Sequence, residues 1–247
     1  MGSTATDVAG AVALCKLEPD GADCAEEMFA HEFPQHEVLL SDVWVDRTEV
    51  TQRSYDQCVA SGACRAIALA GSARFRGPDL PVVLVTYHDA EAYCAWAGKR
   101  LPTEAEWERA ARGLAGRVYP WGNVYNPSIV NHGRLALSFW VGTDWTSLDE
   151  SDGFFELAPV GTFVGGRTPD AIDDLAGNVE EWVADWFAPD YPSTSEVNPK
   201  GPERGDLRVV RGGSFVDARP FLRGAARRSD PPSARRAWRG FRCARDP

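Results

Sequence analysis

The sequence lacks any long apolar run. None of the hydrophobic stretches in its 247 residues reaches the ~18 residues that a membrane-spanning helix needs. It also lacks a charged n-region followed by an apolar h-region, the pattern that opens a secretory signal peptide. An excess of basic charge is missing as well, because 36 acidic residues outnumber 26 basic ones and give a formal net charge of −10. These absences argue against a membrane span and against nucleic acid as a partner, since an acidic protein repels a polyanion at long range.

Familiar catalytic and metal motifs are absent too. The sequence contains no phosphate-binding loop, no dinucleotide motif and no G-x-S-x-G nucleophile elbow. Nothing in their spacing brings Ser214, His88 and Asp217 together as a hydrolase triad. The sequence does not favour a zinc site, because no C-x2-C or C-x2-4-C spacing occurs and no His has a Cys partner at ligand spacing. The histidines are not expected to bind zinc: we place His31 and His36 on a surface loop, His88 at a helix start and His132 in a loop.

Glycine, proline and tryptophan are plentiful. The chain has 23 Gly, 17 Pro and 9 Trp, the composition of a loop-rich protein in which aromatic side chains supply much of the buried area. With 44% hydrophobic residues it can bury one substantial core, and its length alone would allow one or two domains.

The charge is unevenly spread along the chain. Residues 203–247 hold twelve Arg against five acidic residues, a local charge of +7, which leaves −17 for the remainder. We favour the interpretation that these Arg are solvated or paired with acids from the first part of the chain. The alternative is a basic rim around a cleft that selects acidic ligands.

Periodicity and capping signals predict a few regular elements. Residues 37–46 are apolar and β-branched enough for a strand or a pair of strands. Helices are predicted at 50–59, with Thr51 as N-cap, and at 86–97, ended by Gly98. The clearest helix is 103–112, where Thr103 and Glu106 complete a capping box. After residue 113 we expect mostly loops and short strands.

Several segments, in order along the chain, resemble the sulfatase-modifying-factor, or formylglycine-generating enzyme, family. They are residues 1–3 (Met-Gly-Ser), 44–51, 93–107, 119–123, 174–182, 211–214 (Arg-Gly-Gly-Ser) and 240–244 (Gly-Phe-Arg-Cys-Ala). The resemblance implies an α+β fold, an elaborated C-type-lectin-like domain with long loops, as a single domain over residues 1–247. Because Met1-Gly-Ser3 matches the family's first strand and turn, we expect a secreted or periplasmic protein whose export signal is not part of this chain.

Six cysteines in a loop-rich chain suit an oxidising compartment, although six Cys allow fifteen pairings and six reduced thiols in a cytosolic protein are the alternative. The resemblance implies a bond between Cys94 and Cys243, whose long loop is worth at most about 5 kcal/mol. Two further pairs bracket short loops that can turn back through glycine, each worth roughly 2 to 3 kcal/mol. They are Cys58 with Cys64 and Cys15 with Cys24.

The family's copper ligands are missing. In its oxidases, two cysteines after the Arg-Gly-Gly-Ser turn bind copper(I), and oxygen converts a substrate cysteine to formylglycine. No Cys occurs here from Gly212 to Arg242. Asp217 stands in place of the first, and the second falls within residues 219–224, a stretch about two residues shorter than the family pattern. Copper is not expected, because a carboxylate is a hard ligand and copper(I) requires soft thiolates.

The resemblance and the missing thiols together predict a non-oxidase domain that acts as an extracytoplasmic ligand-binding or accessory module. Its ligand would be a peptide, glycan or protein. Glu180 stands where the family commonly has Trp, and Ser214 has the alternative role of a turn hydroxyl. The expected groove consists of Ser214, Asp217, Arg219, Phe221, Arg223, Arg228, Glu180 and Trp238. Two alternatives remain: a diverged formylglycine-generating oxidase or related oxygen-using enzyme with different metal ligands, and a variable-loop lectin-like display protein.

Calcium is the expected structural cofactor, because irregular loops can aim carboxylate, amide and carbonyl oxygens inward. The resemblance implies two ligand sets. The first is Asn131, His132, Asp152 and Phe154; the second is Asp174, Gly177, Val179 and Glu181. We rank the second ahead because its members are local in sequence. In the plainest alternative, Asp152 begins an ordinary turn and Asp174 is a helix N-cap.

Overall fold

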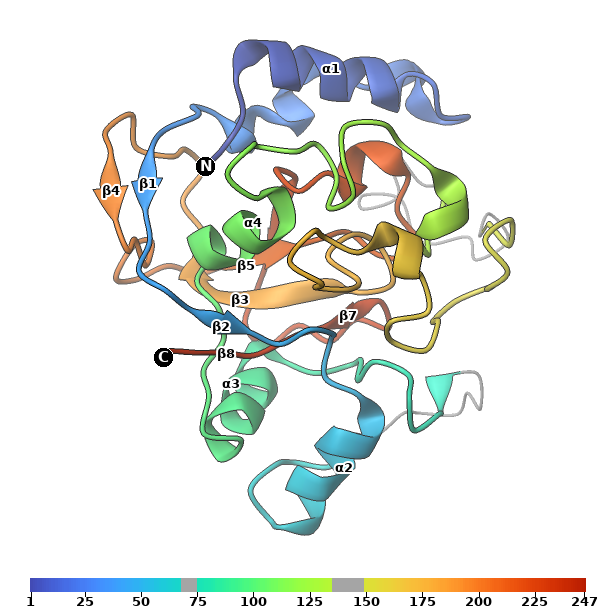
Figure 1. Cartoon of the computed structure of the whole chain (residues 1–247), viewed down its shortest axis with the longest axis vertical. Coiled ribbons are helices and arrows are strands. Elements are labelled where there is room, and N and C mark those ends of the chain that lie inside the picture. The colour runs from blue at the N-terminus through green and yellow to red at the C-terminus, as the bar shows by residue number, and fades with distance from the viewer. Residues whose placement is uncertain (68–74, 135–148) are drawn as a thin grey trace.

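A four-stranded mixed sheet lies at the centre of the computed structural model, which describes residues 1–67, 75–134 and 149–247 (Figure 1). Its strand order is β6-β5-β3-β7. The strands are β3 (Glu180–Trp186), β5 (Arg208–Arg211), β6 (Arg227–Asp230) and β7 (Arg239–Gly240). β5 runs antiparallel to both β3 and β6, whereas β7 runs parallel to β3. All four strands come from the last third of the chain, where short strands were predicted.

Two small sheets flank the central one. β1 (Val38–Leu39) pairs in parallel with β4 (Glu196–Val197), and β2 (Trp44–Val45) pairs antiparallel with β8 (Ala244–Arg245). The predicted strand pair at 37–46 is therefore confirmed as two short strands. Each one pairs with a distant segment instead of with the other.

The three predicted helices are confirmed, and so are the N-terminal caps predicted for two of them, Thr51 and Thr103. They are α2 (Gln52–Ala60), α3 (Tyr87–Trp96) and α4 (Glu104–Arg112). Thr51 caps α2, and Thr86 caps α3. At α4 the Thr103 hydroxyl accepts the Glu106 N–H at 3.2 Å, while the Glu106 carboxylate accepts the Thr103 N–H at 2.7 Å, which completes the capping box. None of the helices in the described residues has the length and apolarity to cross a bilayer.

A fourth helix, α1 (Ala5–Cys15), was not predicted. It begins with a capping box between Thr4 and Asp7, and three 3-10 turns follow it: η1 (Gly21–Asp23), η2 (Glu26–Met28) and η3 (Ala30–Glu32). This N-terminal segment lies across the top of the molecule in Figure 1 and contacts the 3-10 turn η8 (Arg219–Leu222). Two further 3-10 turns are η5 (Pro127–Ile129) and η7 (Val164–Gly166).

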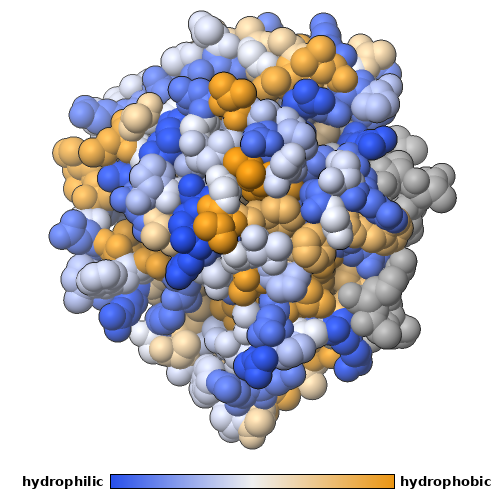
Figure 2. Space-filling view, turned by 45° about the vertical axis from the view of Figure 1, so that its right-hand side comes forward, coloured by the Kyte–Doolittle hydropathy of each residue, from blue (hydrophilic) through white to orange (hydrophobic). Residues whose placement is uncertain are grey.

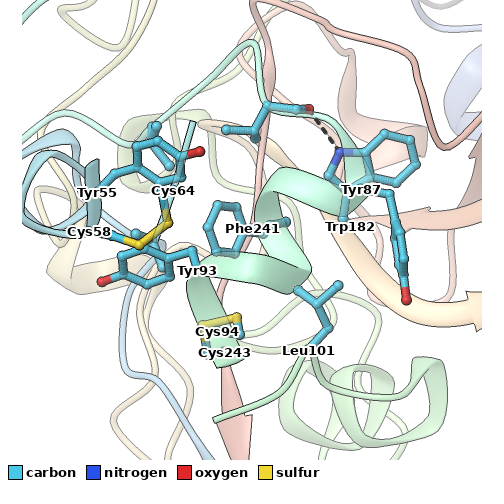
Figure 3. Packing of buried hydrophobic residues seen from close by; sticks show 14 of the residues in the cluster. Tyr55, Cys58, Cys64, Tyr87, Tyr93, Cys94, Leu101, Trp182, Phe241 and Cys243 are labelled. Carbon is cyan, nitrogen blue, oxygen red and sulfur yellow. Dashed lines mark hydrogen bonds between the residues drawn. A yellow bond between two sulfur atoms is a disulfide. The ribbon is translucent and has the colours of Figure 1, made fainter. Parts of the chain in front are cut away.

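The largest hydrophobic cluster packs α2 and α3 against the central sheet (Figure 3). Trp182 of β3 is fully buried, and its indole N–H donates to the Val85 carbonyl at 3.1 Å. Tyr93 of α3 meets Phe241 edge to face, with ring centroids 5.5 Å apart. Aromatic side chains thus supply much of this core, as the composition indicated. On the surface, hydrophobic residues gather toward the middle of the face in Figure 2, with hydrophilic side chains around them.

Three disulfides use all six cysteines and confirm each predicted pairing. They are Cys15–Cys24, Cys58–Cys64 and Cys94–Cys243. The first two close local loops, whereas the third joins α3 to a residue 149 positions away, beside β8. No thiol remains in the chain.

Candidate functional site

The Arg-Gly-Gly-Ser turn follows directly on β5. Gly213 has φ 64°, and a Cβ there would lie 2.7 Å from the Phe221 carbonyl oxygen, so only glycine fits. Ser214 donates to the Asp217 carboxylate from its backbone N–H at 2.9 Å and from its hydroxyl at 2.8 Å. Both side chains are completely buried. The Ser214 hydroxyl therefore bonds within the turn, as its alternative role had it, but to a side chain instead of the backbone.

Asp217 is the first member of a buried chain of alternating charges. Arg228 donates to Asp217 at 2.6 Å, and its second amino nitrogen lies 3.7 Å from the Glu180 carboxylate. Arg239 donates to Glu180 at 2.8 Å from Nε and at 2.5 Å from Nη2, and to Asp230 at 2.7 Å. Burial raises the pKa of Glu180, and the neighbouring Arg239 and Arg228 guanidinium groups oppose that rise. An ion-pair network thus surrounds Asp217, the residue for which the resemblance implies the place of the family's first copper ligand.

Three predicted groove residues are covered by the N-terminal segment. Arg219 donates to Glu18, and the Phe221 ring stacks on Phe29 with centroids 5.5 Å apart. Arg223 is buried and binds Glu32 through two hydrogen bonds of 2.9 and 2.5 Å.

The predicted groove set is therefore split. Asp217, Glu180 and Arg228 form one group, while Arg223 binds Glu32 of the N-terminal segment. Trp238 is half-buried beside the core, and its carbonyl oxygen accepts the Glu180 N–H at 3.0 Å.

The C-terminal arginines are used internally, as the favoured interpretation of the charge asymmetry predicted. Nine of the twelve Arg in residues 203–247 form ion pairs with carboxylates. Seven of their partners come from residues 1–202: Glu18, Glu32, Asp89, Glu104, Glu108, Glu180 and Glu181. The opposite charges of the two parts of the chain therefore hold them together.

The first expected calcium set is brought together. The two Asp152 oxygens accept the backbone N–H groups of His132 at 2.9 Å and Phe154 at 2.8 Å. Asn131 is buried and donates from Nδ2 to the Glu156 carbonyl at 2.8 Å, whereas no donor among the described residues reaches its Oδ1. A buried acceptor without a donor suits a hard cation, so these residues fit calcium.

The residues of the second expected calcium set also lie together, but Arg242 binds the carboxylate of one of them. Arg242 donates to both Glu181 oxygens, at distances from 2.7 to 3.0 Å, and the Trp107 indole N–H donates to Glu181 at 3.0 Å. Asp174 accepts the Gly161 N–H at 2.6 Å and has φ 57°, in a turn that starts no helix. The N-cap alternative for Asp174 is therefore wrong.

Gly177 needs its lack of a side chain, because a Cβ there would lie 2.0 Å from the Asn131 carbonyl oxygen. This contact places the turn that carries the second set against Asn131 of the first. Val179 is buried in the hydrophobic cluster behind that turn.

Glu49 lies beside Asp174, and sequence reasoning missed it. Burial, followed by the neighbouring Asp174 carboxylate, raises the pKa of Glu49 well above its ordinary value. Its Oε1 has no donor among the described residues. Two adjoining buried carboxyl groups either share a proton or bind a cation, so the donor chemistry at Glu49 and Asp174 also fits calcium. In residues 1–67, 75–134 and 149–247 no three His, Cys, Asp or Glu side chains converge, so backbone carbonyls would have to complete either shell.

The histidines are placed nearly as expected, with one correction. His31 is exposed, and His88 is the second residue of α3. His132 lies in a loop, where it is buried 3.9 Å from the Asp149 carboxylate. His36 is buried instead of lying on an exposed loop, because its backbone bonds to Met1 and its ring packs against Tyr191.

Comparison with known proteins identifies the family to which the chain belongs. Residues 11–247 match the family model of the sulfatase-modifying factor enzyme 1-like domain. The chain is 44% identical over 185 residues to the formylglycine-generating enzyme of Thermomonospora curvata, which is 72% of this chain and 59% of that protein. It is 41% identical over 172 residues to the mouse inactive C-alpha-formylglycine-generating enzyme 2. This match covers 67% of this chain and 49% of that protein. The matched region thus spans about half the length of these relatives.

Solved structures share the fold. PvdO from Pseudomonas aeruginosa is 29% identical with a TM-score of 0.70, over 88% of this chain and 85% of that one. Treponema denticola variable protein 1, at 23% identity and a TM-score of 0.67 over 86% of this chain and 87% of that one, shows the same fold. The α+β fold expected from the resemblance is confirmed. The chain belongs to the sulfatase-modifying factor enzyme 1-like domain family.

Proposed function

We propose that this chain is a non-oxidase member of its family that serves as a ligand-binding or accessory module outside the cytoplasm. The proposal rests mainly on the burial and the hydrogen bonds of Asp217. This carboxylate stands in place of a copper thiolate, is completely buried, and is bonded by Ser214 and Arg228. A guanidinium at 2.6 Å repels any metal cation that approaches the same oxygen atoms.

The cysteines give independent support. Copper(I) requires thiolates, and a disulfide has no thiolate to give. Since all six cysteines are bonded in pairs, the chain offers no soft ligand elsewhere. Three disulfides also favour an oxidising compartment, which supports a location outside the cytoplasm.

The similarity to the mouse protein named as inactive supports an accessory role. A chain that keeps the family's fold without its thiols can offer a surface for a ligand while it lacks the chemistry. The proposed ligand is a peptide, glycan or protein.

Calcium is proposed as a structural ion. Asn131 and Asp152 would hold it in the first set with carbonyls of His132 and Phe154, and Glu49 would join Asp174 in the second. When bound, the ion would supply positive charge to buried carboxylates that otherwise compete for protons.

The oxidase question is tested with purified protein loaded with copper(I) and incubated in air with a sulfatase-type peptide. We expect no conversion of the peptide cysteine to formylglycine, as followed by mass spectrometry. The Thermomonospora curvata enzyme, treated in the same way, is the matched positive control. A stoichiometric aldehyde product from this chain would overturn the proposal and favour the diverged oxidase.

A further inference from the structure

A small pocket lies between the end of β3 and the start of α4. Its volume is about 200 Å³, and two residues of β3, two of α4 and several of the segment 188–202 line it. None of the lining residues belongs to the groove predicted from the sequence. The pocket is therefore a separate candidate site, and what it binds goes beyond the proposed function.

Asp185 is the most deeply placed carboxylate of β3 in this pocket. The residue is 4% exposed, and its Oδ2 accepts the Glu104 N–H at the start of α4 at 2.7 Å. Its Oδ1 receives no hydrogen bond from the described residues. A Cβ on Gly201, which also lines the pocket, would lie 3.1 Å from this Oδ1. The absence of a side chain at Gly201 thus leaves one oxygen of a buried carboxylate available to a ligand in the pocket.

The pocket has more acids than cations. Four carboxylic acids line it, against the guanidinium of Arg227 and the amino group of Met1. Arg227 already binds both Glu104 oxygens, at 2.8 and 2.9 Å. Asp185 has no ion-pair partner among the described residues, and burial, followed by repulsion from Glu104, raises its pKa. A buried carboxylate without a cation costs free energy, so a ligand that supplies positive charge would be stabilised there.

The shape and the free oxygen select among cations. A pocket of this volume, walled by Trp186 and by Pro192, Pro199 and Pro202, suits an organic group better than a bare metal ion, whose shell needs several oxygens. A guanidinium is bound best by both oxygens of a carboxylate, and Oδ2 of Asp185 is already occupied. A primary ammonium is a compact charge that one acceptor can hold. The prolines have no N–H, so they offer no donor that competes with it.

We infer that this pocket binds a primary ammonium group on a short aliphatic chain, with Asp185 as its ion-pair partner. Two sources share this chemistry: a lysine side chain of a partner protein and a free small amine. The aliphatic chain would lie against the proline wall. Asp190 is exposed and the Glu196 side chain is 35% exposed, so both would attract the cation from nearer the surface. The net charge of −10 on the whole chain acts in the same direction.

The test is an NMR titration of the full chain with Nα-acetyl-lysine amide, and with Nα-acetyl-norleucine amide as the uncharged probe of similar shape. We expect the lysine probe to bind and to shift the signals of the Trp186 indole and the Gly201 amide. The norleucine probe should bind at least about tenfold more weakly, because it cannot form the charge-assisted hydrogen bond. 1-Aminopentane distinguishes the two sources: tighter binding than that of the lysine probe indicates a free amine, and weaker binding indicates a lysine side chain.

Asp185→Asn keeps an acceptor for the Glu104 N–H and removes the charge. It should weaken binding of the lysine probe by about ten- to hundredfold. The variant should melt no earlier than the unchanged protein, which separates lost binding from lost folding. Asp190→Asn is the matched control, because it removes an exposed carboxylate from the same pocket. It should weaken binding by no more than about threefold.

Equal binding of the lysine and norleucine probes, or shifts confined to residues outside the pocket, would overturn the inference. Both are measured on the unchanged protein and do not depend on how a variant folds. Equal losses in Asp185→Asn and Asp190→Asn would overturn it as well, because the attraction would then come from surface charge alone. None of these results bears on the oxidase test, because copper loading and product formation do not involve the amine.

Discussion

Buried charge is the recurrent feature at the scale of single residues. Asp185 of β3 is buried and accepts the Glu104 N–H at 2.7 Å, next to a second carboxylate. Burial, followed by repulsion from Glu104, raises the pKa of Asp185 to about 7. Unlike Asp217, it has no ion-pair partner among the described residues, so its ionisation works against the fold.

The pH dependence of this residue follows from linkage. Between the ordinary pKa of 3.8 and about 7, the unfolded state is ionised while the folded state keeps its proton, so stability falls as the pH rises and levels off above 7. Asp185→Asn keeps an acceptor for Glu104 and removes the charge. We expect it to stabilise the protein at pH 8, with a ceiling of about 4 kcal/mol, and progressively less toward pH 4.

Urea unfolding of both proteins at pH 5 and pH 8 measures the difference. A gain of the same size at both pH values would show that Asp185 does not titrate in this range.

At the scale of elements, local sequence signals specified the helices. The one helix that was not predicted carries the same kind of signal. α4 has a capping box at Thr103 and ends at Gly113, whose φ of 64° suits glycine. α1 carries the same signal, Thr4 with Asp7 three residues later, and the sequence interpretation overlooked it. Strands were harder to predict, because β1 and β2 are two residues long and depend on partners more than 150 positions away.

The cap of α4 is testable on its own. Thr103→Ala removes the acceptor for the Glu106 N–H and should cost about 1 kcal/mol of unfolding free energy. Thr103→Ser keeps a hydroxyl and should restore most of the loss. Chemical denaturation of the unchanged protein and the two variants measures the unfolding free energies. An alanine variant as stable as the serine variant would mean that the hydroxyl contributes nothing.

At the scale of the whole molecule, contacts between distant segments decide what the candidate site looks like. The N-terminal segment lies over η8 through Glu18, Phe29 and Glu32, so three residues of the predicted groove, Arg219, Phe221 and Arg223, contact it. The second expected calcium set lies against Glu49 and Arg242, which are almost 200 positions apart in the chain.

Calcium binding would stabilise the native state by mass action, by about 2.7 kcal/mol when the ion is at one hundred times its dissociation constant. A chelator should then lower the melting temperature by roughly 5 to 10 °C for a domain of this size. Glu49→Gln should lose part of that shift, because it removes a carboxylate beside Asp174.

Glu181→Gln is the less clean variant, since it also deprives the buried Arg242 of its partner. Differential scanning calorimetry with and without chelator, and with magnesium as the ionic control, is the measurement. An unmoved transition would mean that proton sharing, and no ion, holds Glu49 and Asp174.

The sequence by itself determined the family, the caps of α2 and α4 and all three disulfides, because these depend on short patterns or on motifs that recur in the family. It also indicated that the C-terminal arginines pair with acids of the first part of the chain. Only the tertiary structure decided which acid each arginine meets. Arg223 pairs with Glu32 from 191 positions away, and the burial of His36 and Glu49 likewise depends on what packs against them. Periodicity and spacing describe neighbours along the chain, whereas burial and pairing across the fold are set by the packing of segments that the sequence leaves far apart.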